Sequence, residues 1–233
     1  MKSDKKKLSQ MAGAFRREGG IGVGDYDKYW EARREIGEIP YTTRDERIVR
    51  EVHKAVPQGS TILDLGVGPG YYFRALIKDY QMYGVEISGK IIESYDFDNS
   101  RICQCDLNET FPDFGLAFDA VIASMIFHHM DDPDQLIHWL SDSLKPRGLV
   151  IVAAPNIWHI KNLLRVLRGD SPRFSPAHRN FLIPKELSGK MERVGFRRLK
   201  ILPGRSSQNG GLAWLWPSLG ASQLILLFQK NGS

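Results

Sequence analysis

The segment 61–70 constrains the fold of this chain more than any other. Its sequence, TILDLGVGPG, is a short apolar run that ends in three glycines at alternate positions, and a helix-compatible segment, 71–79, follows directly. Glycine accepts a positive φ and lets a ligand approach the backbone closely, so a glycine turn after a strand forms a floor for a nucleotide-like ligand. The pattern therefore predicts a strand, a tight turn and a helix around a nucleotide site.

A carboxylate follows this turn at a distance that supports the same interpretation. Glu86 lies 20 residues after Gly66, at the end of a second apolar run, 82–85. Nucleotide-binding folds place an acidic residue there to accept hydrogen bonds from ribose hydroxyls. Tyr71 stands where a dinucleotide fingerprint has Gly or Ala, and the acidic Asp64 would lie badly beside a pyrophosphate. The motif thus favours a cationic nucleotide ligand over a nicotinamide dinucleotide.

The segment 64–70, DLGVGPG, resembles the first motif of the class I S-adenosylmethionine-dependent methyltransferases, which have a Rossmann-like fold. Within that family the chain is most similar to the ubiquinone-biosynthesis-like branch of small-molecule methyltransferases. The resemblance covers residues 61–156 strongly and 157–230 loosely. It implies S-adenosyl-L-methionine as cofactor and methyl transfer as activity. In this segment and at the end of the second apolar run, it implies cofactor contacts from Asp64, Gly66, Gly68, Gly70, Glu86 and Ile87.

Two later segments match further motifs of the family. Asp106 and Leu107 match the third motif, in which an Asp side chain meets the adenine amino group beside an apolar contact; an Asp that caps its own loop is the alternative. The segment 118–124, FDAVIAS, resembles the fourth-strand motif, which adds Ser124 to the cofactor contacts. The carboxyl ends of parallel strands meet at one edge of a sheet, so we expect all these contacts to lie together.

Two adjacent histidines follow the fourth strand, where the acceptor should approach. In the ubiquinone-biosynthesis-like branch a histidine commonly occupies the position of His129. The pKa of an imidazole suits a general base that takes a proton from an oxygen nucleophile. The resemblance thus makes His129, and after it His128, the candidate catalytic residues. A structural histidine that caps a helix or supports the cofactor side remains an open alternative.

Apolar runs alternate with helical patterns after residue 60, which predicts an α/β fold with a doubly wound, mostly parallel sheet. The family resemblance implies seven strands with the last one antiparallel, and we expect an N-terminal helical extension. An amphipathic helix opens at Pro155-Asn156 and runs to about Arg168. The expected strands are 61–65, 82–86, 101–105, 118–123, 148–153, 196–202 and 222–229, and the other expected helices are 43–55, 71–79, 88–95, 133–143 and 185–194.

A chain of 233 residues is long enough for one α/β domain, which we place at 25–233. Its expected parts are N-terminal helices at 25–57, a cofactor-binding half at 58–156, and a lid with substrate-side elements at 157–233. The Lys-rich segment 1–24 is expected to be a disordered basic tail.

We expect a cytoplasmic protein without stable membrane insertion, because no apolar run reaches the ~20 residues of a span and the N-terminus lacks the apolar core of a signal peptide. Peripheral membrane contact and the oligomeric state stay open. Cys103 and Cys105 are expected to be buried, reduced thiols, and no metal is expected, because two ligands do not make a zinc site.

The basic residues of the chain are unevenly distributed. Residues 25–154 hold 13 basic and 22 acidic residues, whereas 155–205 hold 12 basic and three acidic ones. On the amphipathic helix, Lys161, Arg165 and Arg168 form a stripe beside an apolar face. This distribution favours an anionic, partly apolar acceptor, although a solvated basic face would look the same.

Three other functions compete with methylation of a small molecule. The fourth strand is followed by SMIF at 124–127 rather than by the Asn/Asp-Pro-Pro-aromatic signature of amino-methylating enzymes, so nucleic acid is not the expected substrate. A catalytically silent methyltransferase-fold partner subunit remains an alternative. A nicotinamide-dependent oxidoreductase remains a second one, which Asp64 and Tyr71 argue against.

Overall fold

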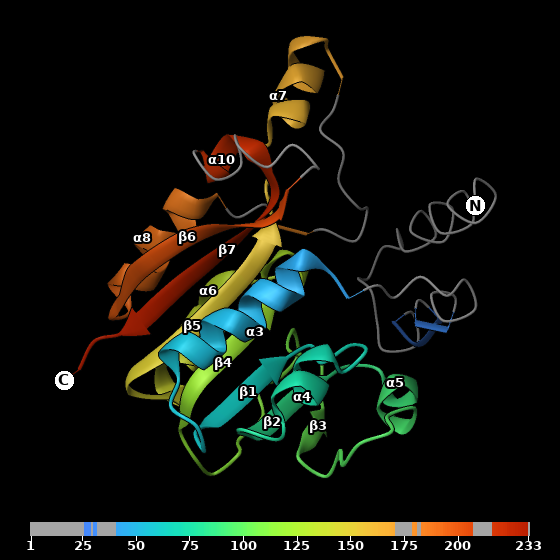
Figure 1. Cartoon of the computed structure of the whole chain (residues 1–233). Helices are drawn as coiled ribbons and strands as arrows, with labels where there is room; N and C mark the ends of the chain where they lie inside the picture. The colour runs from blue at the N-terminus through green and yellow to red at the C-terminus, as the bar shows by residue number, and fades with distance from the viewer. Residues whose placement is uncertain are drawn as a thin grey trace.

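The computed structural model describes residues 26–28, 30–31, 41–170, 179–180, 183–206 and 216–232. One seven-stranded sheet runs through it in the order β3-β2-β1-β4-β5-β7-β6 (Figure 1). The pairs among β1 to β5 are parallel, and β7 is antiparallel to both β5 and β6. The predicted α/β sheet is confirmed. The strands are β1 (Thr61–Leu65), β2 (Gln81–Glu86), β3 (Ile102–Gln104), β4 (Phe118–Ser124), β5 (Leu144–Pro155), β6 (Phe196–Ser206) and β7 (Ala221–Lys230).

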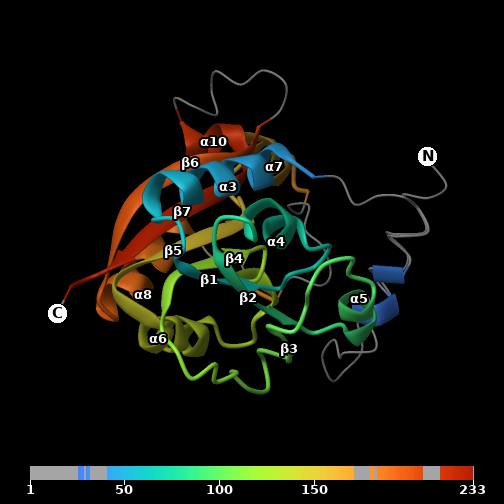
Figure 2. The same ribbon diagram turned by 60° about the horizontal axis from the view of Figure 1, so that its bottom comes forward.

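Helices cover both faces of the sheet, because successive strand residues point to opposite sides. On one side lie α3 (Thr43–Ala55) and α4 (Tyr71–Leu76), and on the other lie α6 (Pro133–Ser143) and α8 (Pro184–Arg193) (Figure 2). Leu63 of β1 packs in the core shared with α6 and α8, and its neighbour Ile62 packs in the core shared with α3 and α4. Each fully buried Leu or Ile contributes about 1.5–3 kcal/mol.

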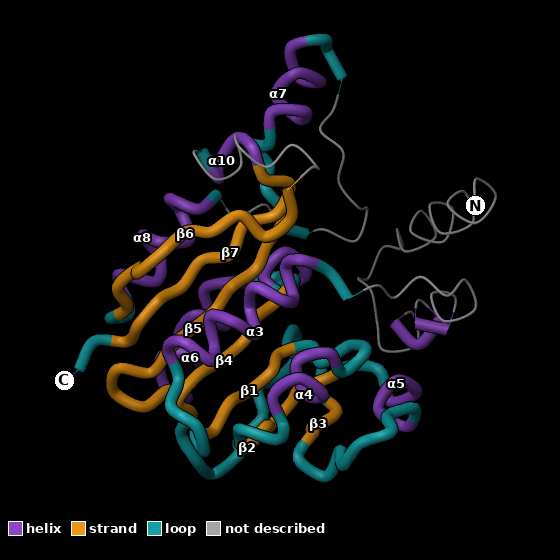
Figure 3. Tube along the Cα trace, in the orientation of Figure 1, coloured by secondary structure: helices purple, strands orange, loops and turns teal. Residues whose placement is uncertain are grey.

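Several short helical segments remain among the described residues, including residues 26–28 and 30–31. α5 (Gly89–Glu93) and the 3-10 helix η1 (Phe127–His129) follow β2 and β4, whereas α7 (Ile160–Leu167) and α10 (Pro217–Gly220) lie close together at one end of the molecule (Figure 3). No helix in the described ranges is long and apolar enough to cross a membrane.

Several predicted boundaries are wrong, and three of them have clear local reasons. α4 ends at Leu76 rather than at 79, because the carbonyl of Leu76 accepts hydrogen bonds from Asp79 N and Tyr80 N in a turn that buries the Tyr80 ring. β5 begins at Leu144 rather than at 148. Leu144 pairs with β4, and Arg147 takes a positive φ of 64° beside an irregularity in the β4–β5 register.

The third wrong boundary is the start of the amphipathic helix, which is Ile160 rather than Pro155. β5 continues its pairing with β7 through Pro155, and Asn156 then turns the chain. The predicted tail at 1–24 lies outside the described residues.

Candidate cofactor and active site

The glycine turn after β1 has the backbone that the sequence predicts. Gly66, Gly68 and Gly70 have φ values of 70°, 52° and 78°, in the left-handed region that side chains disfavour. The carbonyl of Val85, near the end of β2, accepts hydrogen bonds from Gly66 N at 2.8 Å and Val67 N at 3.1 Å. The turn is therefore fixed against the carboxyl end of the neighbouring strand.

Gly70→Ala is expected to lower the free energy of unfolding by about 2–5 kcal/mol. A Cβ at Gly70 would lie 2.6 Å and 2.8 Å from ring atoms of Phe97, and this ring is stacked between Phe73 and Tyr95. The left-handed backbone costs about 1–2 kcal/mol and overpacking adds about 1–3 kcal/mol. The control is Gly115→Ala, with φ of 65° and no heavy atom within 4 Å of the new Cβ. Urea denaturation that gives equal losses in the two variants would contradict the packing argument.

Glu86 joins the glycine turn to the segment after β2. Its side chain is buried, Oε2 accepts a hydrogen bond from Gly68 N at 2.8 Å, and Oε1 accepts one from Ser88 N at 3.0 Å. Burial raises the pKa of Glu86, while hydrogen bonds from the backbone oppose that rise. A carboxylate has about four acceptor positions, so the backbone donors leave capacity for a ribose hydroxyl. The geometry fits the predicted role, and Ile87 lies half-buried beside it.

Asp64 is a buried carboxylate in the middle of the sheet. It is 0% exposed, and neither carboxylate oxygen has a hydrogen-bond partner among the described residues. Burial raises its pKa well above the ordinary range, and the charges of Glu86 and Asp45 raise it further. An unpaired buried charge is costly, so this carboxyl group ionises readily only beside a cation or a hydrogen-bond donor. S-adenosylmethionine fits this requirement, since it carries both a sulfonium and an ammonium group.

The stability difference between Asp64→Asn and the wild type is expected to depend on pH. Because folding raises the pKa of Asp64, the folded state keeps a proton that the unfolded state loses above about pH 4. As pH rises from about 4 toward the raised pKa of the folded state, the free energy of unfolding of the wild type therefore falls relative to that of the variant, by up to about 1.4 kcal/mol per pH unit. Urea denaturation from pH 4 to 8 measures the difference, and a difference that does not change with pH would contradict the raised pKa.

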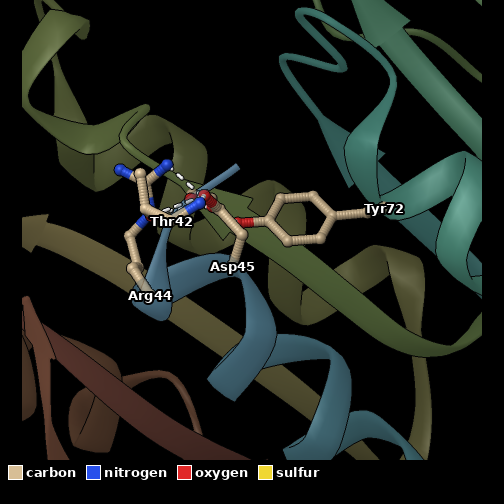
Figure 4. Close-up of polar contacts among 5 residues, drawn as sticks. Thr42, Arg44, Asp45 and Tyr72 are labelled. Atoms are coloured by element: carbon tan, nitrogen blue, oxygen red, sulfur yellow. Dashed lines mark hydrogen bonds and ion pairs between the residues drawn. The ribbon is translucent and has the colours of Figure 1, made fainter. Parts of the chain in front are cut away.

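Asp45 is the centre of a polar cluster that sequence analysis missed (Figure 4). The hydroxyl of Tyr72 donates to Asp45 Oδ1 at 2.7 Å and lies 3.0 Å from Ser124 Oγ. Thr42 N and Oγ1 donate to Asp45 Oδ2, and the guanidinium of Arg44 donates to Oδ1. The cluster ties the start of α3 to α4 and to the end of β4. Its capping box, Thr42 with Asp45, is readable in the sequence.

The segment after β4 carries both predicted catalytic residues. Met125 has a positive φ of 64°, an uncommon conformation for a non-glycine residue that often marks functional sites. His128 and His129 end η1 with ring centroids 4.2 Å apart. His128 is buried, and its carbonyl accepts a hydrogen bond from Arg179 N, whereas the side chain of His129 is half-buried. His129 is therefore the more accessible of the two.

The predicted adenine contacts lie in the loop after β3. Asp106 Oδ1 accepts a hydrogen bond from Asn108 N at 2.9 Å, so this Asp does shape its own loop, and Leu107 packs against the core. The adenine contact stays a prediction. Asn108, which the sequence analysis missed, accepts from Asp131 N and donates to the carbonyl of His129. It joins this loop to the segment of the two histidines.

Described residues of the N-terminal extension lie over the same edge. Asp27 accepts hydrogen bonds from Ser88 Oγ and Lys90 N, and Glu31 pairs with Lys90. The ring of Trp30 would lie 3.2 Å from a Cβ at Gly68. The predicted N-terminal helical extension thus approaches the glycine turn, with residues 26–28 and 30–31 helical.

Two further predictions concern metals and cysteines. Within the described ranges no group of three His, Cys, Asp or Glu residues could hold a metal ion. Cys103 and Cys105 are free thiols, half-buried rather than buried, and burial raises the pKa of Cys105 to about 11. A thiol with that pKa is protonated at neutral pH and is a poor nucleophile.

Comparisons with known sequences match the chain to methyltransferases. The profile of the methyltransferase-domain family matches residues 40–201. An uncharacterized methyltransferase of Schizosaccharomyces pombe is 31% identical over 110 residues, which are 41% of this chain and 38% of that protein. A ubiquinone biosynthesis O-methyltransferase of Chromobacterium violaceum is 27% identical over 161 residues, 63% of this chain and 68% of that one. The chain thus spans less than half of the first relative's length.

Solved structures share the fold at low sequence identity. A methyltransferase of Haloferax volcanii, solved as a complex with the Trm112 activator, has a TM-score of 0.64 at 16% identity, over 91% of this chain and 99% of that one. A methyltransferase of Archaeoglobus fulgidus has a TM-score of 0.62 at 18% identity, over 88% and 100%. The family profile covers well over half of the 233 residues. This chain therefore belongs to the methyltransferase-domain family, the class I S-adenosylmethionine-dependent methyltransferases.

Proposed function

We propose that this protein transfers a methyl group from S-adenosylmethionine to a small-molecule acceptor. The observation that carries the proposal is the buried carboxylate of Asp64, without a partner in the described structure, beside a glycine turn that Glu86 holds in place. The bound cofactor would supply an electrophilic methyl group. The transfer is an in-line displacement, so the protein contributes mainly by orienting the reactants and excluding water.

The roles of the site residues follow from their positions. Gly66, Gly68 and Gly70 let the cofactor approach the backbone, and Glu86 accepts hydrogen bonds from its ribose hydroxyls. Asp64 complements its positive charge. Ile87, Asp106 and Leu107 contact the adenine side, and Ser124 lies at the end of β4, where Tyr72 holds it. These assignments are supported by the shared edge of the sheet at which β1 to β4 end.

His129 is the proposed general base for an oxygen acceptor. Its side chain is half-buried at the end of η1, and its ring lies edge-on to Tyr26 with centroids 6.2 Å apart. It would hold the acceptor's hydroxyl and take its proton. His128 is buried beneath it and is proposed to support its position.

The acceptor is proposed to be anionic and partly apolar. Residues 155–205 carry 12 basic and three acidic residues, and they include α7 with its basic flank. Nucleic acid is not the proposed substrate, and the proposed location is the cytoplasm. Salt-independent kinetics with a neutral acceptor would contradict this acceptor class.

Calorimetric titration of the wild type with S-adenosylhomocysteine and with NADH tests the proposal. We expect binding of S-adenosylhomocysteine and no binding of NADH, because a buried carboxylate disfavours a pyrophosphate. Tight binding of NADH, or no binding of S-adenosylhomocysteine by a folded protein, would overturn it. Transfer from a radiolabelled methyl donor into a fractionated metabolite extract then identifies the acceptor.

A second candidate function is that of a catalytically silent partner subunit. The similar methyltransferase of Haloferax volcanii was solved together with an activator protein, so this fold occurs in a complex of two proteins. Binding of S-adenosylhomocysteine together with no label transferred to any fraction would favour this candidate over the enzyme.

A further inference from the structure

The helix α7 exposes an apolar face that most amphipathic helices bury. None of its eight residues is buried, and Leu167 is 82% exposed. Exposed large apolar side chains on α7 or just before it are Trp158, Ile160, Leu164, Val166 and Leu167, and Trp216 precedes α10 at the same end of the molecule (Figure 1). We call this set the α7 surface. An amphipathic helix on a domain normally turns its apolar stripe toward the core. The exposed stripe of α7 is therefore a candidate binding surface.

The basic residues of α7 lie beside that apolar face. Ile160, Leu164 and Leu167 follow the spacing i, i+4, i+7, which places them on one side of the helix. Lys161, Arg165 and Arg168 repeat this spacing one residue later and so form a flank. Arg165 also lies 3.8 Å from Asp170, which partly neutralises it, so Lys161 and Arg168 dominate the charge of the flank. An apolar face with a basic flank and exposed Trp residues matches the chemistry of an anionic lipid surface.

The attachment of α7 fixes its direction relative to the site. Asn156 Nδ2 donates to the carbonyl of Ala221 at 2.7 Å, and Asn156 Oδ1 accepts from Trp158 N at 3.0 Å. His159, which precedes the helix, is buried. The base of α7 is thus fixed to the start of β7, and the helix extends from the carboxyl end of β5 away from the sheet (Figure 1). The glycine turn and the two histidines follow β1 and β4 at this same edge.

We propose that the α7 surface docks the protein on an anionic lipid bilayer. Ile160, Leu164 and Leu167 enter the boundary between headgroups and acyl chains, while Lys161 and Arg168 meet the lipid phosphates. Docking would turn the carboxyl edge of the sheet toward the membrane. The proposal does not depend on the proposed methyl transfer, because vesicle binding is measured without an acceptor.

Flotation of the full chain with vesicles tests it. We expect the protein to bind phosphatidylglycerol vesicles at least tenfold more strongly than phosphatidylcholine vesicles, and to bind more weakly in 0.5 M salt, since salt screens exposed charges. Leu164→Glu/Leu167→Glu should lower binding at least tenfold, because carboxylates replace the apolar face. Lys161→Glu/Arg168→Glu should do the same, because it reverses the flank.

Two double variants serve as matched controls. Leu116→Glu/Leu199→Glu changes two exposed leucines outside the α7 surface, and Lys185→Glu/Arg193→Glu makes the same charge change on α8. Both control variants should bind anionic vesicles within about threefold of the wild type. All variants should keep binding S-adenosylhomocysteine. Absence of binding of the wild type to anionic vesicles would overturn the proposal, as would equal losses in the controls.

A second copy of this chain is the main competing occupant of the α7 surface. Sedimentation velocity distinguishes it from a bilayer. A wild-type dimer that Leu164→Glu/Leu167→Glu converts to a monomer, together with no vesicle binding, would assign the surface to self-association and overturn the proposal.

Discussion

Glu86→Gln is expected to weaken the binding of S-adenosylhomocysteine by about tenfold to a hundredfold. Gln keeps the size of the side chain but has one acceptor oxygen, so it cannot accept from both Gly68 N at 2.8 Å and Ser88 N at 3.0 Å. One of these hydrogen bonds is lost, and the ribose hydroxyls lose a charged acceptor. Hydrogen bonds to a charged group are worth about 1.5–3 kcal/mol each, and each 1.4 kcal/mol is tenfold in affinity.

The control for this prediction is Glu93→Gln on α5. It makes the same change of charge on an exposed side chain seven residues further along the chain. Calorimetry should give Glu93→Gln the same dissociation constant for S-adenosylhomocysteine as the wild type. Urea denaturation checks that both variants are folded under the conditions of the titration. Unchanged affinity in Glu86→Gln, or the same loss in Glu93→Gln, would remove Glu86 from the cofactor site.

The parts of the site that sequence alone predicts are those that local patterns determine. The glycine turn follows an apolar strand directly, and Glu86 ends the next strand, so strand register brings them together without any knowledge of distant packing. Parallel strands place their carboxyl ends at one edge. From that rule alone, the sequence predicts that Asp106, Ser124 and the two histidines lie in the same region.

The rest depends on contacts between distant segments. The hydroxyl of Tyr72 joins Asp45 and Ser124, which lie 27 and 52 positions away in sequence, and no periodicity shows such a link. Trp30 lies against Gly68, and nothing in the sequence around either residue predicts this contact. The amphipathic pattern at 160–168 predicts a helix correctly, but it cannot say whether the apolar face is buried. Only the packing shows that α7 has no buried residue.

His129→Ala is expected to lower kcat for an oxygen acceptor by about a hundredfold or more, because a positioned general base contributes about 10²–10⁴ in rate. The dissociation constant for S-adenosylhomocysteine should stay nearly unchanged, since the proposed cofactor contacts come from the glycine turn, Glu86 and the loop after β3. Single-turnover transfer of a radiolabelled methyl group measures the rate, and calorimetry measures the affinity. This split between rate and affinity distinguishes a base from a structural histidine.

Two other histidines control for the change itself. His138→Ala removes an exposed imidazole from α6 and should leave both quantities as in the wild type. His128→Ala empties a buried position beside the His129 ring. Its main effect should therefore be to lower the free energy of unfolding, by about 1–3 kcal/mol, rather than to lower kcat specifically. If His129→Ala behaves like His128→Ala, with lost stability or lost cofactor binding, then His129 supports the loop after β4. In that case the methyl acceptor needs no base from this segment, because displacement at a sulfonium methyl group can proceed by orientation alone.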